Sequence, residues 1–232
     1  MLIDHTNARV LDVLENRDKS TVAAWLAAGR DSGLLAQVEE VTTDMWDGYA
    51  TATREALGSR VRIVVDRFHV MKHFQDRLEK ARREIQHTLP KEAASALKGS
   101  RWLWITNAEH LTKEQRQHLD RLKAQFPALA VLAEHRDQLR QIFQEPHIKA
   151  TSAGVFCLSD WCRRGRRLGI AALQPFYKML ESWMTEIANY FVSRSSNGRT
   201  EGFNRGLRTI LWRTCGMTNF QHFRLRVLHA FG

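Results

Sequence analysis

The sequence has few cysteines and no long apolar run, and each absence narrows the class of protein. No stretch of about 18 or more apolar residues occurs, which excludes a transmembrane helix. The first residues, MLIDHTNARV, lack the basic region and apolar core of a secretory signal peptide. The cysteines Cys157, Cys162 and Cys215 are an odd, sparse set without a second Cys/His pair at zinc-finger spacing, which disfavours a disulfide framework or a zinc site. We therefore expect a soluble cytoplasmic protein.

Acidic residues are outnumbered by basic ones. The 232 residues include 35 Lys and Arg against 25 Asp and Glu, which gives a formal net charge of +10 and a pI near 10.0. The hydrophobic fraction of 44% is ordinary for a chain that buries a real core. A domain this basic usually binds a polyanion, and nucleic acid is the first candidate.

Short strands alternate with helices over the first ninety residues. The segments VEEVTT and VRIVV are typical of strands, and the second is a continuous β-branched run of the kind buried on both faces of a sheet. An earlier pair of strands is joined by a turn around residues 4–7. The predicted strands are residues 1–3, 9–14, 38–43 and 61–65. Three helices are predicted: one that begins after Ser20 or Thr21 as its N-cap, one over residues 49–57, and one from Arg67 to just before Pro90.

Residues 91–192 differ from the segment before them because they are helical almost throughout and contain no convincing strand. No internal repeat or low-complexity linker occurs. We predict a partial α/β core at residues 1–90, an α-helical insertion at 91–192, and a C-terminal helical part of the core at 193–232.

Two aspartates, Asp44 and Asp66, follow directly after predicted strands. They lie 22 positions apart, which is the length of one β–α–β step, and in a parallel pair such a step brings both strand ends to the same edge of the sheet. That edge is where ligands bind in open α/β sheets. Clustered carboxylates in a basic protein suggest a divalent metal ion, since Mg²⁺ prefers oxygen ligands and can promote phosphoryl transfer. The alternative is that both residues are helix caps.

A third acid, Glu201, lies among arginines in the stretch SSNGRTEGFNRGLRTILWR. One interpretation is a solvated helix face on which Glu201 pairs with a neighbouring arginine and adds little stability. The other is that Glu201 holds a metal ion while Arg199, Arg205, Arg208 and Arg213 bind the phosphates of a nucleic acid.

The segment DRFH places Asp66 and His69 three residues apart, so that both lie on one helix face and can bond each other or one metal ion. The alternative is a helix-initiating aspartate followed by a partly buried histidine.

A second basic group lies in the helical block. It is either a solvated surface or a further contact with phosphates, and it consists of Arg163, Arg164, Arg166 and Arg167.

Three segments together are specific for one family. VTTDMWDGYATATREAL, then VRIVVDRFHVMKHFQDRLEKARRE, then SNGRTEGFNRGLRTILWRTCGMTNFQHFRLRVL resemble the catalytic region of the ISL-three family of bacterial insertion-sequence transposases. The motifs DMW, DRFHV and SNGxxEGxN occur in the family's order and spacing. The resemblance extends over essentially the whole chain and is sharpest at residues 38–86 and 195–228.

This resemblance implies an α/β fold with an RNase H-like (retroviral-integrase-like) core and a large all-α insertion before the helix of the catalytic glutamate. Such enzymes use an Asp-Asp-Glu triad with Mg²⁺ (or Mn²⁺) to cut DNA at the ends of the element and to join the freed 3′-hydroxyl to target DNA, acting as homo-oligomers. By motif, Asp44 is the second aspartate and Glu201 the glutamate, and both bind metal. Asp66 and His69 match a supporting Asp-x-x-His signature, and Asn204 lies near the site. DNA is the implied partner, and a nucleoid-associated location follows.

The chain departs from the family pattern at its first strands. An RNase H-like core begins with three antiparallel strands and carries the first catalytic aspartate on the first of them, whereas only two strands precede the first helix here. Asp4 resembles a turn residue, and the family's cysteine-rich head and helix-turn-helix are absent. We therefore expect an N-terminally truncated copy that lacks the first strand and is inactive on its own. The alternatives are a non-catalytic DNA-binding remnant and an RNase H-like nuclease that acts by hydrolysis only.

Overall fold

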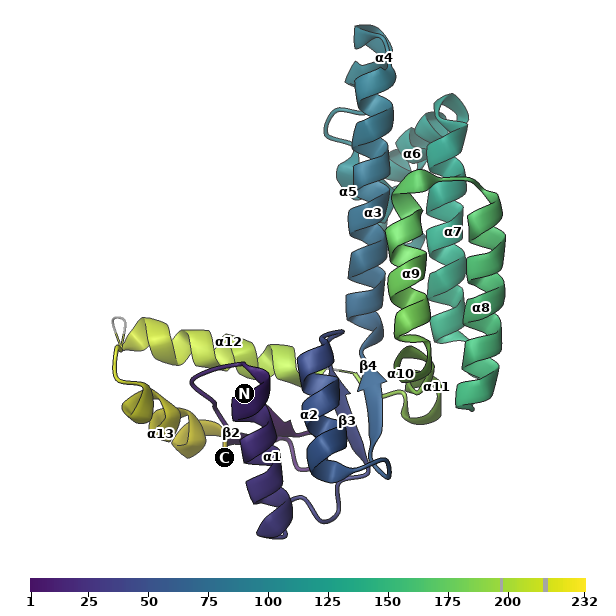
Figure 1. The fold of residues 1–232 in the computed structure, drawn as a ribbon. Helices are drawn as coiled ribbons and strands as arrows, with labels where there is room; N and C mark the ends of the chain where they lie inside the picture. Colours follow the sequence, from purple (N-terminus) through teal and green to yellow (C-terminus); the bar gives the residue numbers. More distant parts are fainter. Residues whose placement is uncertain (197, 215–216) are drawn as a thin grey trace. The chain divides into compact units, whose positions relative to one another are not determined.

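The protein is a mixed α/β chain in which helices predominate (Figure 1). The computed structural model describes residues 1–196, 198–214 and 217–232, and at Arg199 it describes the backbone alone. The chain divides into two compact units. Unit 1 consists of Met1–Asp66 and Arg194–Gly232, and unit 2 of Arg67–Ser193. In the described residues, no helix is both long and apolar enough to cross a membrane.

Unit 1 contains all the strands of the described residues. The predicted strand and helix order is confirmed, with boundaries that differ from the prediction by a few residues. The elements are β1 (Leu2–Asp4), β2 (Arg9–Asp12), α1 (Lys19–Asp31), β3 (Glu40–Thr43), α2 (Asp47–Leu57), β4 (Arg62–Val65), α12 (Gly198–Arg213) and α13 (Phe220–Phe231).

The strands β1 and β2 form an antiparallel hairpin whose turn is stabilised by Asp4. The Asp4 carboxylate accepts hydrogen bonds from the backbone N–H of Asn7 (3.0 Å) and from its side-chain amide (2.7 Å). Such local bonds from an aspartate side chain stabilise a reversal of the chain. The prediction that Asp4 is a turn residue is confirmed.

The N-cap of α1 differs from the prediction. The cap is Asp18 rather than Ser20 or Thr21, and its carboxylate accepts a hydrogen bond from the backbone N–H of Thr21 at 2.8 Å. A carboxylate caps as well as a hydroxyl and also favours the positive end of the helix dipole. The helix therefore begins two or three residues earlier, at Lys19.

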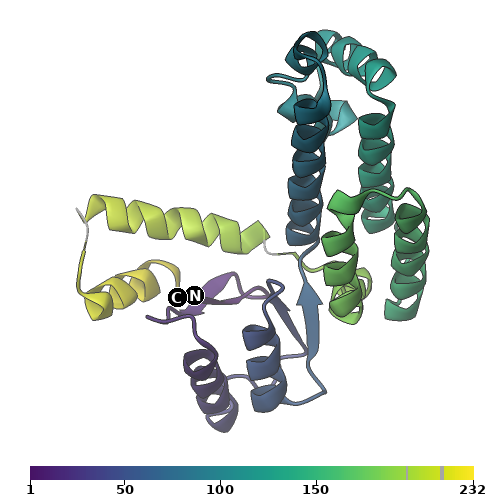
Figure 2. The same cartoon turned by 45° about the horizontal axis from the view of Figure 1, so that its top comes forward.

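The strands β3 and β4 are parallel and side by side (Figure 2). Their register pairs Glu40 with Arg62 and Thr43 with Val65, so the two strands end at the same level. In β4, Val64 and Val65 are fully buried, as the β-branched run predicted.

Helices cover the strands of unit 1 from two sides. Leu2 and Val41, from the two pairs of strands, pack against a cluster formed by α1, α2 and the segments that follow them. Val10 and Val13 pack against Val227 and the apolar residues of α12 and α13. The strands nevertheless form two separate pairs, β1 with β2 and β3 with β4, and no strand of the described residues joins them.

Unit 2 is helical throughout its length, as predicted for residues 91–192. Its first helix ends at Thr88, just before Pro90, again as predicted. The elements are α3 (Arg67–Thr88), α4 (Lys91–Ala96), α5 (Arg101–Ile105), η1 (Ala108–His110), α6 (Lys113–Gln125), α7 (Pro127–Gln144), α8 (Thr151–Arg167), η2 (Ala171–Leu173), α9 (Gln174–Ser182), α10 (Met184–Ala188) and α11 (Tyr190–Ser193).

An aromatic cluster holds α7, α8 and α9 together in unit 2. The imidazole of His135 stacks on the indole of Trp161 with ring centroids 4.0 Å apart, and its Nε2 lies 3.0 Å from the hydroxyl oxygen of Tyr177. Burial lowers the pKa of His135 to about 4, so the imidazole is neutral at physiological pH. Gly165 provides the space for this contact, because a Cβ at that position would collide with both His135 and Tyr177.

Candidate functional site

Asp44 and Asp66 lie next to each other at the carboxyl edge of β3 and β4. Each follows directly after the last register pair, Thr43 with Val65, and neighbouring strands lie about 4.8 Å apart. The prediction that both residues share one edge of a parallel pair is confirmed. The two carboxylates differ in access to solvent, since Asp44 is exposed and Asp66 is only 3% exposed.

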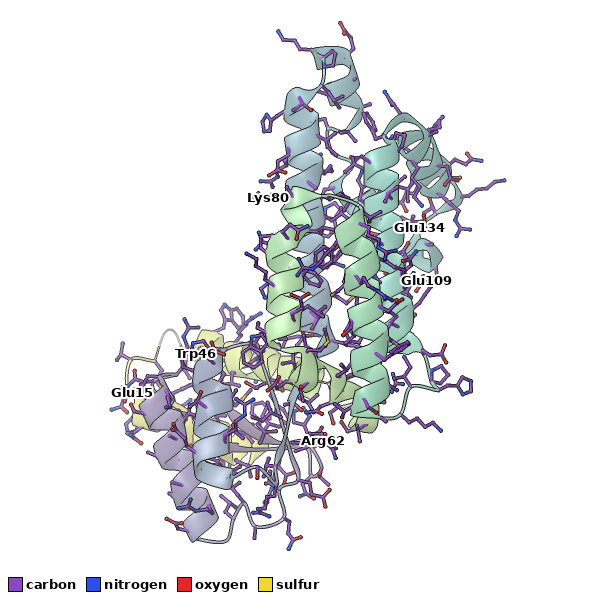
Figure 3. All side chains as sticks on the ribbon, turned by 45° about the vertical axis from the view of Figure 1, so that its right-hand side comes forward. Glu15, Trp46, Arg62, Lys80, Glu109 and Glu134 are labelled. Carbon is purple, nitrogen blue, oxygen red and sulfur yellow. The ribbon has the colours of Figure 1, made fainter. Side chains whose placement is uncertain are left out.

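Two aromatic residues, Trp46 and Tyr49, follow Asp44 at the start of α2. The backbone N–H of Trp46 donates a hydrogen bond to the carbonyl oxygen of Asp44 at 2.8 Å, which turns the chain into α2. The Trp46 ring contacts Tyr49 edge-on at a centroid distance of 4.4 Å and covers Gly48, where a side chain would collide with it. Figure 3 labels Trp46 near the start of α2, and Arg62 marks the start of β4, at the other end of the strand from Asp66.

Glu201 lies in the first turn of α12 and is exposed. The residue before it, Thr200, has its hydroxyl oxygen 3.3 Å from Nε2 of His5, which follows β1, so the start of α12 is attached to the hairpin. Within the described residues, Glu201 forms no ion pair with any arginine. The neighbouring Arg199 has its side chain outside the described residues, so the pairing of Glu201 with that arginine stays a prediction.

The arginines of α12 lie on its surface. Arg205, Arg208 and Arg213 are exposed, and none has an acidic partner in the part of the chain that the structure describes. Asn204, one turn after Glu201, is exposed as well. The side chain of Arg199 lies outside the described residues, as does Cys215.

His69 lies in the first turn of α3, at the start of unit 2, whereas Asp66 is the last residue of the first segment of unit 1. His69 is half-buried, and its ring contacts the exposed Phe68 edge-on at 5.7 Å. The segment DRFH therefore spans the junction between the two units.

The basic group of α8 is partly neutralised by acids. Arg163 and Arg164 both pair with Asp160, and Arg166 pairs with Glu181 at 2.7 Å. Arg167 is exposed and has no acidic partner among the described residues. A hollow of about 280 Å³ is lined by three of these arginines, Arg163, Arg166 and Arg167, together with Cys162 and Met184. Burial raises the pKa of the Cys162 thiol to about 12, which keeps it protonated and unreactive.

The carboxylates of unit 1 are oxygen donors of the type that Mg²⁺ binds. Among the described side chains, however, no three from His, Cys, Asp and Glu come together as a group that could hold a metal ion. Asp44 and Asp66 are thus neighbours at one edge of the strand pair, and Glu201 belongs to the same unit on α12.

Two residues with a place in the site were not predicted from the sequence, His5 and Trp212. The signal for Trp212 was present, since Glu201, Arg205, Arg208 and Trp212 follow one another at spacings of four, three and four residues, which is one face of a helix. His5 had no local signal, because its contact with Thr200 spans 195 positions.

An α/β unit interrupted in the sequence by an all-helical unit is the arrangement expected of the transposases that the motifs resemble. A family model described as a transposase of the ISL-three DDE type matches residues 1–227, and the chain belongs to this family. It is 26% identical over 237 residues to the transposase for insertion sequence element IS1001 of Bordetella parapertussis, an alignment that covers 100% of this chain and 56% of that protein. The chain thus spans about half the length of the curated relative it matches. No solved structure gives a significant match.

Proposed function

We propose that this chain is the catalytic part of an insertion-sequence transposase, with Asp44 and Glu201 as the carboxylates that bind Mg²⁺. The observation that carries the proposal is the parallel, in-register pairing of β3 with β4, which sets Asp44 at a ligand-binding edge of the strands. The transposases of this family act on DNA, and the net charge of +10 suits that partner. The substrates are the ends of the element and the target DNA, and the active complex is a homo-oligomer.

The protein side chains have distinct roles in this site. Asp44 is exposed and would hold the metal ion, while the buried Asp66 supports the end of the neighbouring strand, and His69 belongs to the same supporting signature. Glu201, in the first turn of α12, supplies the second metal ligand, and Asn204 contacts DNA one turn further on. When bound, Mg²⁺ stabilises charge on the attacking and leaving oxygens of an in-line phosphoryl transfer.

The arginines hold the DNA backbone. Arg205, Arg208 and Arg213 are exposed on α12, and their charges are available to phosphates because no acid of the described residues pairs with them. Arg199 belongs to this group by its position in the sequence. On α8, Arg167 and the paired Arg163, Arg164 and Arg166 give a second, weaker contact.

The core of this chain is an incomplete RNase H-like fold, with residues 91–192 as its insertion. The support is the separation of the strands into two pairs on the same helical layer of α1 and α2, since an RNase H-like core has one continuous sheet. A strand paired with both β1 and β3 would join them, and that strand would carry the first aspartate. Chain 1–232 by itself is therefore expected to bind DNA with little or no strand transfer.

Metal binding tests the assignment of Asp44 and Glu201. We expect Mn²⁺, measured by electron paramagnetic resonance, to bind the purified chain and to bind at least about tenfold more weakly after Asp44→Asn or Glu201→Gln, because each change removes one anionic ligand. Glu15→Gln is the matched control, since Glu15 is an exposed glutamate of the same unit. Equal Mn²⁺ affinity in all four proteins would refute the proposed ligands.

Strand joining tests the incomplete core. Supplied with Mg²⁺ and a duplex that ends in a free 3′-hydroxyl, the chain should yield no joined product above background. Joined product that disappears in Glu201→Gln would show that chain 1–232 already holds a complete catalytic site.

A further inference from the structure

One face of α12 carries both charge and an aromatic ring. Glu201, Arg205, Arg208 and Trp212 are spaced at four, three and four residues, so they form a single stripe along the helix. All four are exposed. We call these residues the α12 stripe.

The opposite face of α12 is fixed to the core of unit 1. Phe203, Leu207 and Ile210 pack with the cluster of Val10, Val13 and Val227. Gly206 also permits close approach of α13, because a Cβ there would lie 2.5 Å from the ring of Phe231. The direction in which the α12 stripe points is therefore set by packing, and the stripe faces solvent.

Trp212 is the most exposed large hydrophobic side chain of the described residues, at 81%. An exposed indole offers one of the largest apolar surfaces in the chain for contact with a partner, and its N–H suits an interface that is partly apolar and partly wet. Its neighbour one turn before is Arg208, an exposed cation without an acidic partner among the described residues. A ring of this kind beside cations matches a nucleic-acid strand, whose phosphates bind arginine and whose bases stack on aromatic faces.

We propose that Trp212 stacks on an unpaired DNA base while Arg205 and Arg208 bind the phosphates of the same strand. The base must be unpaired, because the faces of a base inside a duplex are already covered by its neighbours. This inference rests on the proposed function and adds to it the kind of DNA that the site recognises, namely a strand with an exposed base near the phosphate that is cut.

The helix sets the position of that base. Glu201 and Trp212 are separated by 11 residues, or about 16 Å along the helix at 1.5 Å per residue. Successive phosphates of one strand lie about 3.4 Å apart along duplex DNA. The stacked base therefore lies at most about five steps from the phosphate at Glu201.

Fluorescence of 2-aminopurine tests the stacking, because stacking on an aromatic ring quenches this base analogue. The probes are duplexes of identical sequence in which one 2-aminopurine is either paired or left in a single-base bulge. We expect the chain to bind the bulged probe more tightly, to quench it, and to bind it about tenfold more weakly after Trp212→Ala, with affinity for the paired probe unchanged. Trp212→Phe, which keeps a flat ring, should restore most of the quenching.

Trp102→Ala is the matched control, since Trp102 is also an exposed tryptophan, at 66%, but lies on α5 of unit 2. It should leave the affinity for the bulged probe within about twofold of the unchanged protein. If Trp212→Ala binds and quenches the bulged probe like the unchanged protein, the stacking is refuted while DNA binding by the arginines still stands. If the variant instead loses only concentration-dependent self-association in sedimentation, Trp212 belongs to a contact between copies and the proposal is wrong.

Discussion

At the scale of single residues, Asp12 connects three elements of unit 1. Its carboxylate accepts hydrogen bonds from Nε and a terminal nitrogen of Arg224 on α13 (2.5 and 3.0 Å), from the indole N–H of Trp25 on α1 (2.7 Å) and from the backbone N–H of Val13 (2.7 Å). Burial alone would raise the pKa of Asp12, but the hydrogen bonds from Arg224, Trp25 and Val13 outweigh it and lower the pKa. Asp12 thus attaches the last helix of the chain to the first hairpin.

We expect Asp12→Asn to destabilise unit 1 by about 2 kcal/mol, because the hydrogen bonds lose their anionic acceptor and the Arg224 guanidinium loses its counter-charge. The folded pKa of Asp12 is lower than the unfolded one, so its contribution is present above about pH 4 and is lost as the pH falls through the folded value. Urea unfolding at neutral and acid pH measures both effects. The stability difference between the two proteins should shrink at acid pH, and a constant difference would contradict this account.

Replacement of glycine by alanine is expected to have opposite effects on stability at two positions within helices. Gly165→Ala should destabilise unit 2 by about 1–3 kcal/mol, because the new methyl group collides with His135 and Tyr177 in a packed core. Gly202→Ala should stabilise unit 1 by about 0.5–1 kcal/mol, since nothing lies within 4 Å of the new methyl group and alanine is the better helix former. Thermal unfolding measures both, and a shift of the same sign in the two variants would show that packing at Gly165 does not decide its stability.

At the scale of elements, the pattern of hydrophobic residues was sufficient for most of the fold. The run VRIVV identified a strand buried on both faces, and the 22 positions between Asp44 and Asp66 indicated a parallel step. The start of α1 was misplaced because Asp18, Ser20 and Thr21 are all good caps, and the choice depends on which oxygen reaches a free N–H. The local sequence does not show which of these side-chain oxygens reaches the free N–H.

Some contacts of the candidate site could be predicted from the sequence, and others could not. Asp44 and Asp66 could be placed together because the parallel register is a short-range consequence of one β–α–β step. The pairs of Arg163 and Arg164 with Asp160 follow the helical spacings of three and four residues and could have been predicted from the sequence. The pair of Arg166 with Glu181 joins α8 to α9, so no local pattern reveals it. The attachment of α12 to His5 spans nearly the whole chain, so no window of sequence could reveal it.

At the scale of the whole molecule, the net charge of +10 is unevenly available to a polyanion. On α8 of unit 2, Asp160 neutralises part of the charge of Arg163 and Arg164. On α12 of unit 1, Arg205 and Arg208 are exposed without an acidic partner among the described residues. Each cation that binds a phosphate contributes about one unit to the slope of log affinity against log salt concentration.

The double variant Arg205→Ala/Arg208→Ala should therefore flatten that slope by about 2 and weaken binding to all DNA sequences alike. Arg163→Ala/Arg164→Ala removes the same number of positive charges, but it also releases Asp160 from its partners, so the flattening should be less than half as large. Fluorescence anisotropy with a labelled duplex at several salt concentrations measures both slopes. If the two double variants flatten the slope equally, the pairs with Asp160 exchange freely for phosphate, and α8 contributes to the DNA interface as strongly as α12.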